Sequence, residues 1–141
     1  MRFLHLNPTG LPDWSATFSQ VVAVEHEGLR HVQVSGQVGV DEDKRLVGDG
    51  GFDAQVDGSF SNLEVALASA GASWDNVVKL TVFVVNYQRP HSSSLTRALA
   101  SRFEPGRLPA LSLVGVAALA DPQFLVEVEA TAVVQISSQE L

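Results

Sequence analysis

Residues 125–136 read Leu-Val-Glu-Val-Glu-Ala-Thr-Ala-Val-Val-Gln-Ile, and this stretch decides the fold. A period of two predicts a β-strand with one buried side. The side expected to be buried holds only small or branched apolar residues: Val126, Val128, Ala130, Ala132, Val134 and Ile136. The other side mixes apolar residues with Glu127, Glu129 and Thr131. We therefore expect a sheet with one face packed against a core. The second face is too apolar to be exposed to water over its whole area.

Four further stretches are typical of strands. Residues 77–85 place Val78, Leu80, Val82 and Val84 on one side, and their other side, with Thr81 and Phe83, is mixed like that of 125–136. The remaining expected strands cover 20–26, 29–40 and 110–119. The glycine-rich piece 41–51 predicts a hairpin tip that leads into a helix.

Two stretches have the period of a helix. The first begins at Asp53 as the expected N-cap and ends before Gly71, and its apolar residues are three or four apart: Val56, Phe60, Leu63, Leu67 and Ala70. Gly58 lies inside it and weakens a helix by about 1 kcal/mol relative to alanine, so packing must compensate. The second runs from Ser92 to Phe103, before Pro105-Gly106.

The order of elements is strands, helix, strand, helix, strands. This order favours an α+β layer, a mixed sheet with both helices on one face. The opposite face then carries Thr81, Phe83, Glu127 and Thr131 without a covering layer. We expect a second copy of the chain to cover part of it.

Composition limits the classes of function. A chain of 141 residues predicts a single domain over 1–141, with 1–15 as an extended, turn-rich lead-in. Acidic residues outnumber basic ones 16 to 9, a net charge of −7, which disfavours nucleic acid as a partner. With 0 cysteines, thiol catalysis and disulfides are excluded. The early Asn7-Pro8 turn argues against a signal peptide, and no apolar run is long enough to span a membrane. We expect a cytoplasmic protein.

Few residues have the pattern of a reactive site. The four histidines share no metal-ligand spacing, so no metal site is predicted. The glycines of 36–51 lack the lysine of a phosphate-binding loop and the order of a dinucleotide motif. Ser35 lies near a strand end without a nucleophile elbow around it, so its hydroxyl either satisfies backbone groups or contacts a ligand. Glu127 lies among apolar residues, which raise a carboxyl pKa and make acid–base work feasible.

Four segments taken together resemble the RidA/YjgF family, also labelled endoribonuclease L-PSP. They are Val34-Ser35-Gly36-Gln37-Val38, the helix from Asn62-Leu63 to Ala70-Gly71, the strand 78–84, and Leu108-Pro109-Ala110 followed by 126–130. The resemblance covers about residues 16–136. It implies a chorismate-mutase-like α+β fold, a homotrimer with ligand clefts between subunits, and hydrolysis of enamines and imines without metal or organic cofactor.

The resemblance also assigns site residues. The family's water-activating glutamate falls on Glu127, and its strand-end serine on Ser35. Leu111 stands where the family has the arginine that grips the substrate carboxylate, and Phe18 stands where it has a tyrosine. Both changes make the cleft more apolar. Phe83, on the same mixed face, is a further candidate for the ligand site.

Arg107 is the nearby cation that could replace the missing arginine, although an exposed arginine without a ligand is the simpler interpretation. A charged hydrogen bond contributes about 1.5–3 kcal/mol, so its loss weakens carboxylate binding 10- to 100-fold or more. We therefore expect a divergent member that binds a small, less acidic metabolite. A working deaminase of 2-imino and enamine acids, an RNA-cleaving protein and a ligand-free binding module remain the alternatives.

Overall fold

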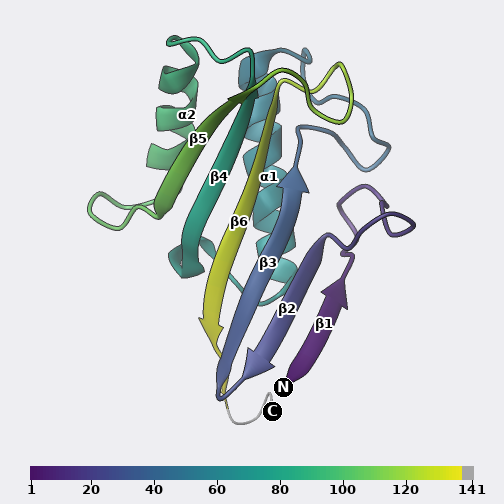
Figure 1. Cartoon of the computed structure of the whole chain (residues 1–141), viewed down its shortest axis with the longest axis vertical. Helices are drawn as coiled ribbons and strands as arrows, with labels where there is room; N and C mark the ends of the chain where they lie inside the picture. Colours follow the sequence, from purple (N-terminus) through teal and green to yellow (C-terminus); the bar gives the residue numbers. More distant parts are fainter. Residues whose placement is uncertain (138–141) are drawn as a thin grey trace.

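The computed structural model describes residues 1–137, which form a six-stranded sheet with two helices (Figure 1). The strands are β1 (Arg2–Leu6), β2 (Val21–His26), β3 (Leu29–Gln37), β4 (Val77–Val85), β5 (Ala110–Val116) and β6 (Val126–Gln135). The helices are α1 (Phe52–Ser69) and α2 (His91–Ala100), with a 3₁₀ turn at Trp74–Asn76. In the sheet the order is β1-β2-β3-β6-β4-β5; β4 and β5 are parallel and the other neighbours antiparallel.

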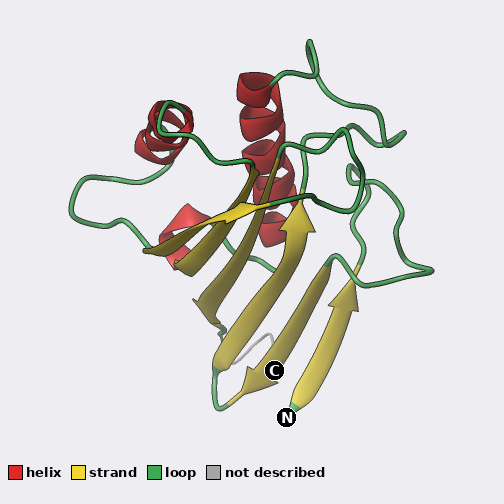
Figure 2. Cartoon of the chain, turned by 45° about the horizontal axis from the view of Figure 1, so that its top comes forward, coloured by secondary structure: helices red, strands yellow, loops and turns green. Residues whose placement is uncertain are grey.

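Both helices lie on one face of the sheet (Figure 2), as the order of elements predicts. The core between these layers is apolar because α1 turns Val56, Phe60, Leu63 and Leu67 toward it, each at most 1% exposed. β6 contributes its regularly alternating side, which is buried from Val126 to Ala132. The α+β class with a mixed sheet is therefore confirmed. No helix within residues 1–137 is long and apolar enough to cross a membrane.

The ends of α1 follow the predicted stop but not the predicted start. Gly71, at φ +73°, ends the helix: its N–H donates to Ala68 and that of Ala72 to Leu67, the paired bonds of a glycine C-cap. The helix begins at Phe52 with Gly51 as N-cap, so the prediction of Asp53 as N-cap is wrong. Asp53 lies in the first turn instead, where its carboxylate suits the helix dipole and accepts a hydrogen bond from Ser94.

Gly58 allows α1 to approach the chain that follows β3. A β-carbon at Gly58 would stand 2.6 Å from Val47 Cγ2 and 3.0 Å from the α-carbon of Gly39. Gly39 in turn has no room, because its β-carbon would meet the Gln55 α-carbon at 2.6 Å. This backbone contact is the packing that offsets the low helix propensity of Gly58.

Two details of the sheet differ from the sequence analysis. Residues 2–6 of the expected lead-in form β1, which pairs with β2 from Arg2–Glu25 to Leu6–Val21. In β4 the register shifts between Val77 and Lys79, so Val77 is buried and Val78 is 49% exposed. The prediction that Val78 shares the core side of Leu80 is therefore wrong, because a bulge displaces one residue.

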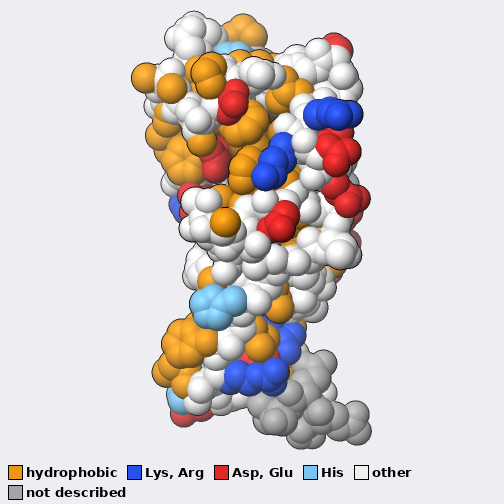
Figure 3. Space-filling model, turned by 90° about the vertical axis from the view of Figure 1, so that its right-hand side faces the viewer, with side chains coloured by type: hydrophobic (Ala, Val, Ile, Leu, Met, Phe, Trp, Pro, Cys, Tyr) orange, Lys and Arg blue, Asp and Glu red, His pale blue; other side chains and the backbone are white. Residues whose placement is uncertain are grey.

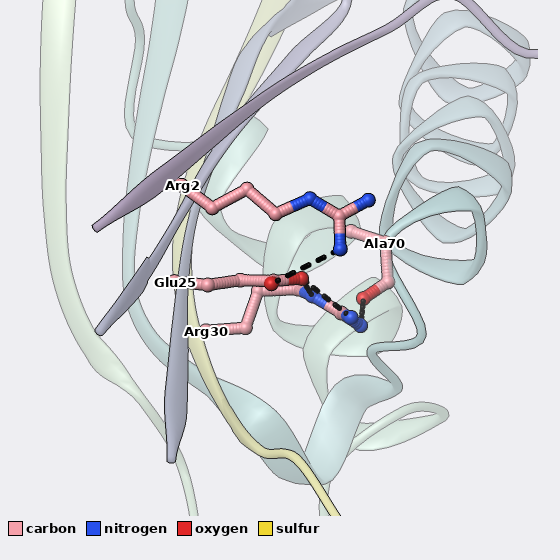
Figure 4. A network of polar contacts seen from close by, with 4 residues as sticks. All are labelled: Arg2, Glu25, Arg30 and Ala70. Carbon is pink, nitrogen blue, oxygen red and sulfur yellow. Dashed lines mark hydrogen bonds and ion pairs between the residues drawn. The ribbon is translucent and has the colours of Figure 1, made fainter. Parts of the chain in front are cut away.

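A charged network ties β1, β2 and β3 to the end of α1 (Figure 4). Arg30 donates to Glu25 Oε1 from Nε at 3.0 Å and from Nη2 at 2.8 Å, and its Nη1 donates to the carbonyl of Ala70 at 2.9 Å. Arg2 lies 3.6 Å from the other oxygen of Glu25. Because Glu25 is only 4% exposed, these arginines take the place of the water that would otherwise contact its carboxylate. The network fixes the sheet edge that lies far from β5.

Candidate functional site

A small cavity opens beside Glu127 on the face of the sheet that the helices leave uncovered. Its volume is about 140 Å³, and segments far apart in the sequence form it: Trp14, Phe18, Gly36, Val38, Ala120, Phe124 and Glu127. Trp14 and Phe18 come from the loop before β2, Gly36 and Val38 from the end of β3, and the others from the approach to β6 and its start. Of the predicted site residues, Phe18 and Glu127 lie together here.

Among the described residues, 1–137, Glu127 is the only ionisable one that lines this cavity. It lies near the start of β6, opposite Phe83 of β4, so its carboxyl emerges on the uncovered face. Within residues 1–137, no hydrogen bond or ion pair reaches that carboxyl. The side chain is half-buried among apolar neighbours.

This setting raises the pKa of Glu127 above its ordinary value of 4.5. Burial is the main cause, since it disfavours the charged carboxylate, and the negative charge of Glu129 on the same side of β6 adds to it. A carboxyl with a raised pKa exchanges a proton closer to neutral pH than an exposed glutamate does. That property suits general acid–base chemistry.

The backbone at the end of β3 packs directly against the Glu127 carboxyl. The register between β3 and β6 shifts between Val34 and Gln37, so Ser35 and Gly36 lie in a bulge. A β-carbon at Gly36 would stand 1.8 Å from Glu127 Oε1 and 2.6 Å from its carboxyl carbon. Glycine is thus required where the carboxyl meets the backbone.

The predicted serine lies in the same bulge but serves the backbone. Ser35 Oγ donates to the carbonyl of Ser19 at 2.6 Å, and Ser35 N donates to Gln20 at 2.9 Å. These bonds tie the bulge to the loop that carries Phe18. Ser35 does not line the cavity. The sequence left open whether its hydroxyl bonds to the backbone or contacts a ligand, and the structure shows the bond to the backbone.

The aromatic wall of the cavity belongs to the loop before β2. The rings of Trp14 and Phe18 stack with centroids 6.2 Å apart and planes at 20°. Lys44, from the hairpin tip after β3, places its Nζ 4.2 Å from the centroid of the Trp14 ring. Trp14 was not among the predicted site residues; its only sequence signal is that a tryptophan stands in a polar, turn-rich segment.

Gln55 holds the opposite wall in place from inside the core. Its Nε2 donates to the carbonyls of Gly50, at 2.9 Å, and Gln123, at 3.0 Å, and its Oε1 accepts from Leu125 N at 2.9 Å. The side chain is 0% exposed. These bonds fix the segment on either side of Phe124, so a helix residue far from the cavity positions one of its rings.

Leu111 and Arg107 lie elsewhere in the same chain. Leu111 pairs with Leu80 of β4, whose side chain is in the core, so it points to the helix side of the sheet and lines a small gap with Leu95 and Leu99 of α2. Phe83 lies opposite Glu127, on the uncovered side. Arg107 lies exposed in the loop between α2 and β5. One chain therefore brings neither Leu111 nor Arg107 to the cavity of Glu127.

Other features of the surface offer less chemistry. A larger hollow of about 600 Å³ lies along residues 7–13 and is bordered by Glu42 and Asp43, but it opens to water and no aromatic ring lines it. In the described part of the chain, 1–137, no group of three or more His, Asp or Glu side chains could hold a metal ion. On the side seen in Figure 3, Lys and Arg lie in separate places among Asp and Glu, without one basic patch.

Comparisons with known proteins agree with the fold. The family model described as endoribonuclease L-PSP matches residues 11–134. A mouse protein named 2-iminobutanoate/2-iminopropanoate deaminase is 31% identical over 128 residues, which cover 91% of this chain and 89% of the relative. A solved structure of a Rid family protein of unknown function from Yersinia pestis has a TM-score of 0.80 at 28% identity and covers 94% of this chain and 100% of that one. Yeast Mmf1 has a TM-score of 0.78 at 28% identity, with 94% and 98% covered.

Proposed function

Because the chain belongs to the RidA/YjgF family, whose family model is described as endoribonuclease L-PSP, we propose that it binds a small metabolite at Glu127 and diverges from the 2-imino acid deaminases. The observation that carries the proposal is the cavity itself. It offers one carboxyl of raised pKa among aromatic and aliphatic side chains, and no Lys, Arg or His of the described part of the chain lines it. A substrate carboxylate placed there would meet apolar walls and a like charge.

The proposal includes a trimer whose clefts lie between subunits. Leu111 and Glu127 point to opposite sides of the sheet in one chain. If both contact one ligand, as the family pattern implies, they must come from different copies. The surface of β5 supports such a contact, because Leu111 is 44% exposed, Leu113 37% and Val114 38%, an apolar edge that isolated sheets avoid.

Hydrolysis of an imine is the reaction that a carboxyl in this position can perform. The Glu127 carboxylate accepts a proton from water as the oxygen bonds to the imine carbon, and the protonated carboxyl then gives the proton to the nitrogen. This addition leaves a carbinolamine. The Glu127 carboxylate then takes the proton of the carbinolamine hydroxyl and returns it to the nitrogen as the C–N bond breaks, which releases ammonia and leaves a carbonyl product. Burial raises the pKa of Glu127 above its ordinary value, which makes its carboxylate a stronger base toward water than that of an exposed glutamate.

An assay of 2-iminobutyrate hydrolysis tests the proposal with four proteins, the wild type and three variants. We expect weak acceleration by the wild type and none by Glu127→Gln, which keeps the size of the side chain but removes the base. Leu111→Arg restores the missing cation and should raise the rate about 10- to 100-fold, the value of a charged hydrogen bond. Val65→Arg, at a position of α1 that is 36% exposed, is the matched control, because it adds the same cation away from β5, and should leave the rate near that of the wild type.

A working 2-imino acid deaminase is the second candidate function. The mouse relative bears that name, and the alignment covers most of both chains. This candidate predicts rapid hydrolysis by the wild type and no gain from Leu111→Arg. A rate that falls when Arg107 is replaced by alanine would identify that arginine as the carboxylate ligand. Either result would overturn the divergent assignment.

A further inference from the structure

The charge of the cavity points to the kind of ligand it takes. Glu127 contributes the only ionisable group of the lining, and its neighbour on the same side of β6, Glu129, is also acidic. Among residues 1–137, two cations lie nearby without lining the cavity: Lys79 of β4, whose Nζ donates to Ser112 at 2.7 Å, and Lys44, whose Nζ lies over the Trp14 ring. The charged group that a ligand in the cavity meets directly is therefore the Glu127 carboxylate, which favours a positive charge on the ligand and disfavours a negative one.

The aromatic rings strengthen this preference. Trp14, Phe18 and Phe124 line the cavity with Glu127. Ring faces attract ammonium groups within about 6 Å, tryptophan most strongly. The structure contains an example of this attraction, because Lys44 Nζ lies 4.2 Å from the ring centroid of Trp14. Aromatic rings around a carboxylate are a known means of holding a cationic nitrogen.

We propose that the site selects a small apolar amine or imine in its protonated form, with no carboxylate of its own. The nitrogen donates to the Glu127 carboxylate, and the aliphatic part fills the space beside Phe18 and Phe124. A volume of about 140 Å³ takes a molecule of few heavy atoms. This inference rests on the proposed function and names the substrate class of that same site.

Three compounds that share an isobutyl group test the inference: isobutylamine, isobutanol and 3-methylbutanoate. They differ in charge, which is positive, zero and negative at about pH 8. Trp74→Phe removes the second tryptophan, so Trp14 in the cavity wall becomes the fluorescent reporter, and calorimetry gives an independent affinity. We expect isobutylammonium to bind at least about tenfold more tightly than isobutanol, and 3-methylbutanoate to bind most weakly.

Two variants test the contact. Glu127→Gln should abolish the advantage of isobutylammonium over isobutanol. Glu129→Gln removes the same charge from the same side of β6 but not from the cavity, and should change the affinity less than about threefold. An equal loss in both variants would mean a general field instead of a direct contact, and would overturn the proposal.

The binding measurements can overturn the cationic ligand without overturning the proposed function. Tighter binding of 3-methylbutanoate, or no binding of isobutylammonium, would exclude the cationic ligand even if 2-iminobutyrate hydrolysis still depends on Glu127. Isobutylammonium binding that is unaffected by Glu127→Gln would also overturn it. If Glu127→Gln leaves both hydrolysis and binding unchanged, the two proposals fail together.

Discussion

The carboxyl of Glu127 rests against the α-carbon of Gly36, so that a β-carbon at position 36 would stand 1.8 Å from Glu127 Oε1. The two residues come from neighbouring strands, β3 and β6, and meet at the bulge where their register shifts. The smallest residue is therefore required because of the glutamate beside it. This contact fixes the direction in which the carboxyl points.

Replacing Gly36 by alanine tests that relationship. The new methyl group cannot coexist with the present carboxyl position, and Glu127 must rotate away from it. We expect ligand affinity and any hydrolysis to fall at least about tenfold, with a loss of stability of about 1–3 kcal/mol from overpacking. Gly106→Ala is the control: its position has a φ of +81° and nothing within 4 Å, so it changes stability alone. Unaltered ligand binding in Gly36→Ala would show that the carboxyl position is not needed.

The raised pKa of Glu127 predicts how stability depends on pH. Because the native state favours the protonated carboxyl, ionisation costs native stability. The cost is absent below the ordinary value of 4.5 and develops as pH rises from there through the raised pKa. Glu127→Gln removes it, so the variant should melt above the wild type at about pH 8 and level with it at about pH 4. A constant difference in Tm across this range would contradict the assignment.

The bonds of Gln55 predict a residue that acts on the site from a distance. Gln55→Leu leaves Leu125 N and the Gln123 carbonyl without their partner. We expect a loss of about 1–3 kcal/mol in the free energy of unfolding and weaker ligand binding, because Phe124 lies between these two groups. Chemical denaturation measures the first effect and calorimetry the second. Gln135→Leu, at an exposed position of β6, should change stability by less than about 0.5 kcal/mol.

The apolar surface of β5 predicts where copies of the chain meet. Val114→Lys places a charge opposite Phe83 on the uncovered face, and should shift a trimer toward monomers in size-exclusion chromatography with light scattering. Val65→Lys is matched in residue type and in exposure, 36% against 38%, but lies on α1. It should leave the assembly intact. A monomeric wild type, or trimers of Val114→Lys, would count against an interface at β5.

The sequence alone predicts the parts of this fold that depend on near neighbours. Alternation in 125–136 places β6 and its buried side correctly, and the spacing of Phe60, Leu63 and Leu67 places α1. Gly71 marks the end of that helix because a left-handed residue suits glycine. Glu127 stands out because a carboxyl lies between apolar residues in a strand. Each of these signals is contained within a few positions of the chain.

The tertiary structure decided what depends on distant segments. Only pairing with β2 makes a strand of residues 2–6, and only the bulge in β4 exposes Val78. Local periodicity fixes which residues share a side of a strand, but it contains no information about the register with a partner far away in the sequence. The close fit of Gly36 beneath Glu127 depends on that register, as does the separation of Leu111 from Glu127.

The site divides in the same way. The sequence predicted Glu127 and Phe18 as site residues, because residue type and family pattern are properties of single positions, and both line the cavity. The tertiary structure added Trp14, Phe124 and the bonds of Gln55, since a cavity wall consists of contacts between loops that no local pattern specifies. The reactive groups of the site follow from residue types, which the sequence gives directly. The shape and charge of the cavity around them arise only when distant segments pack together.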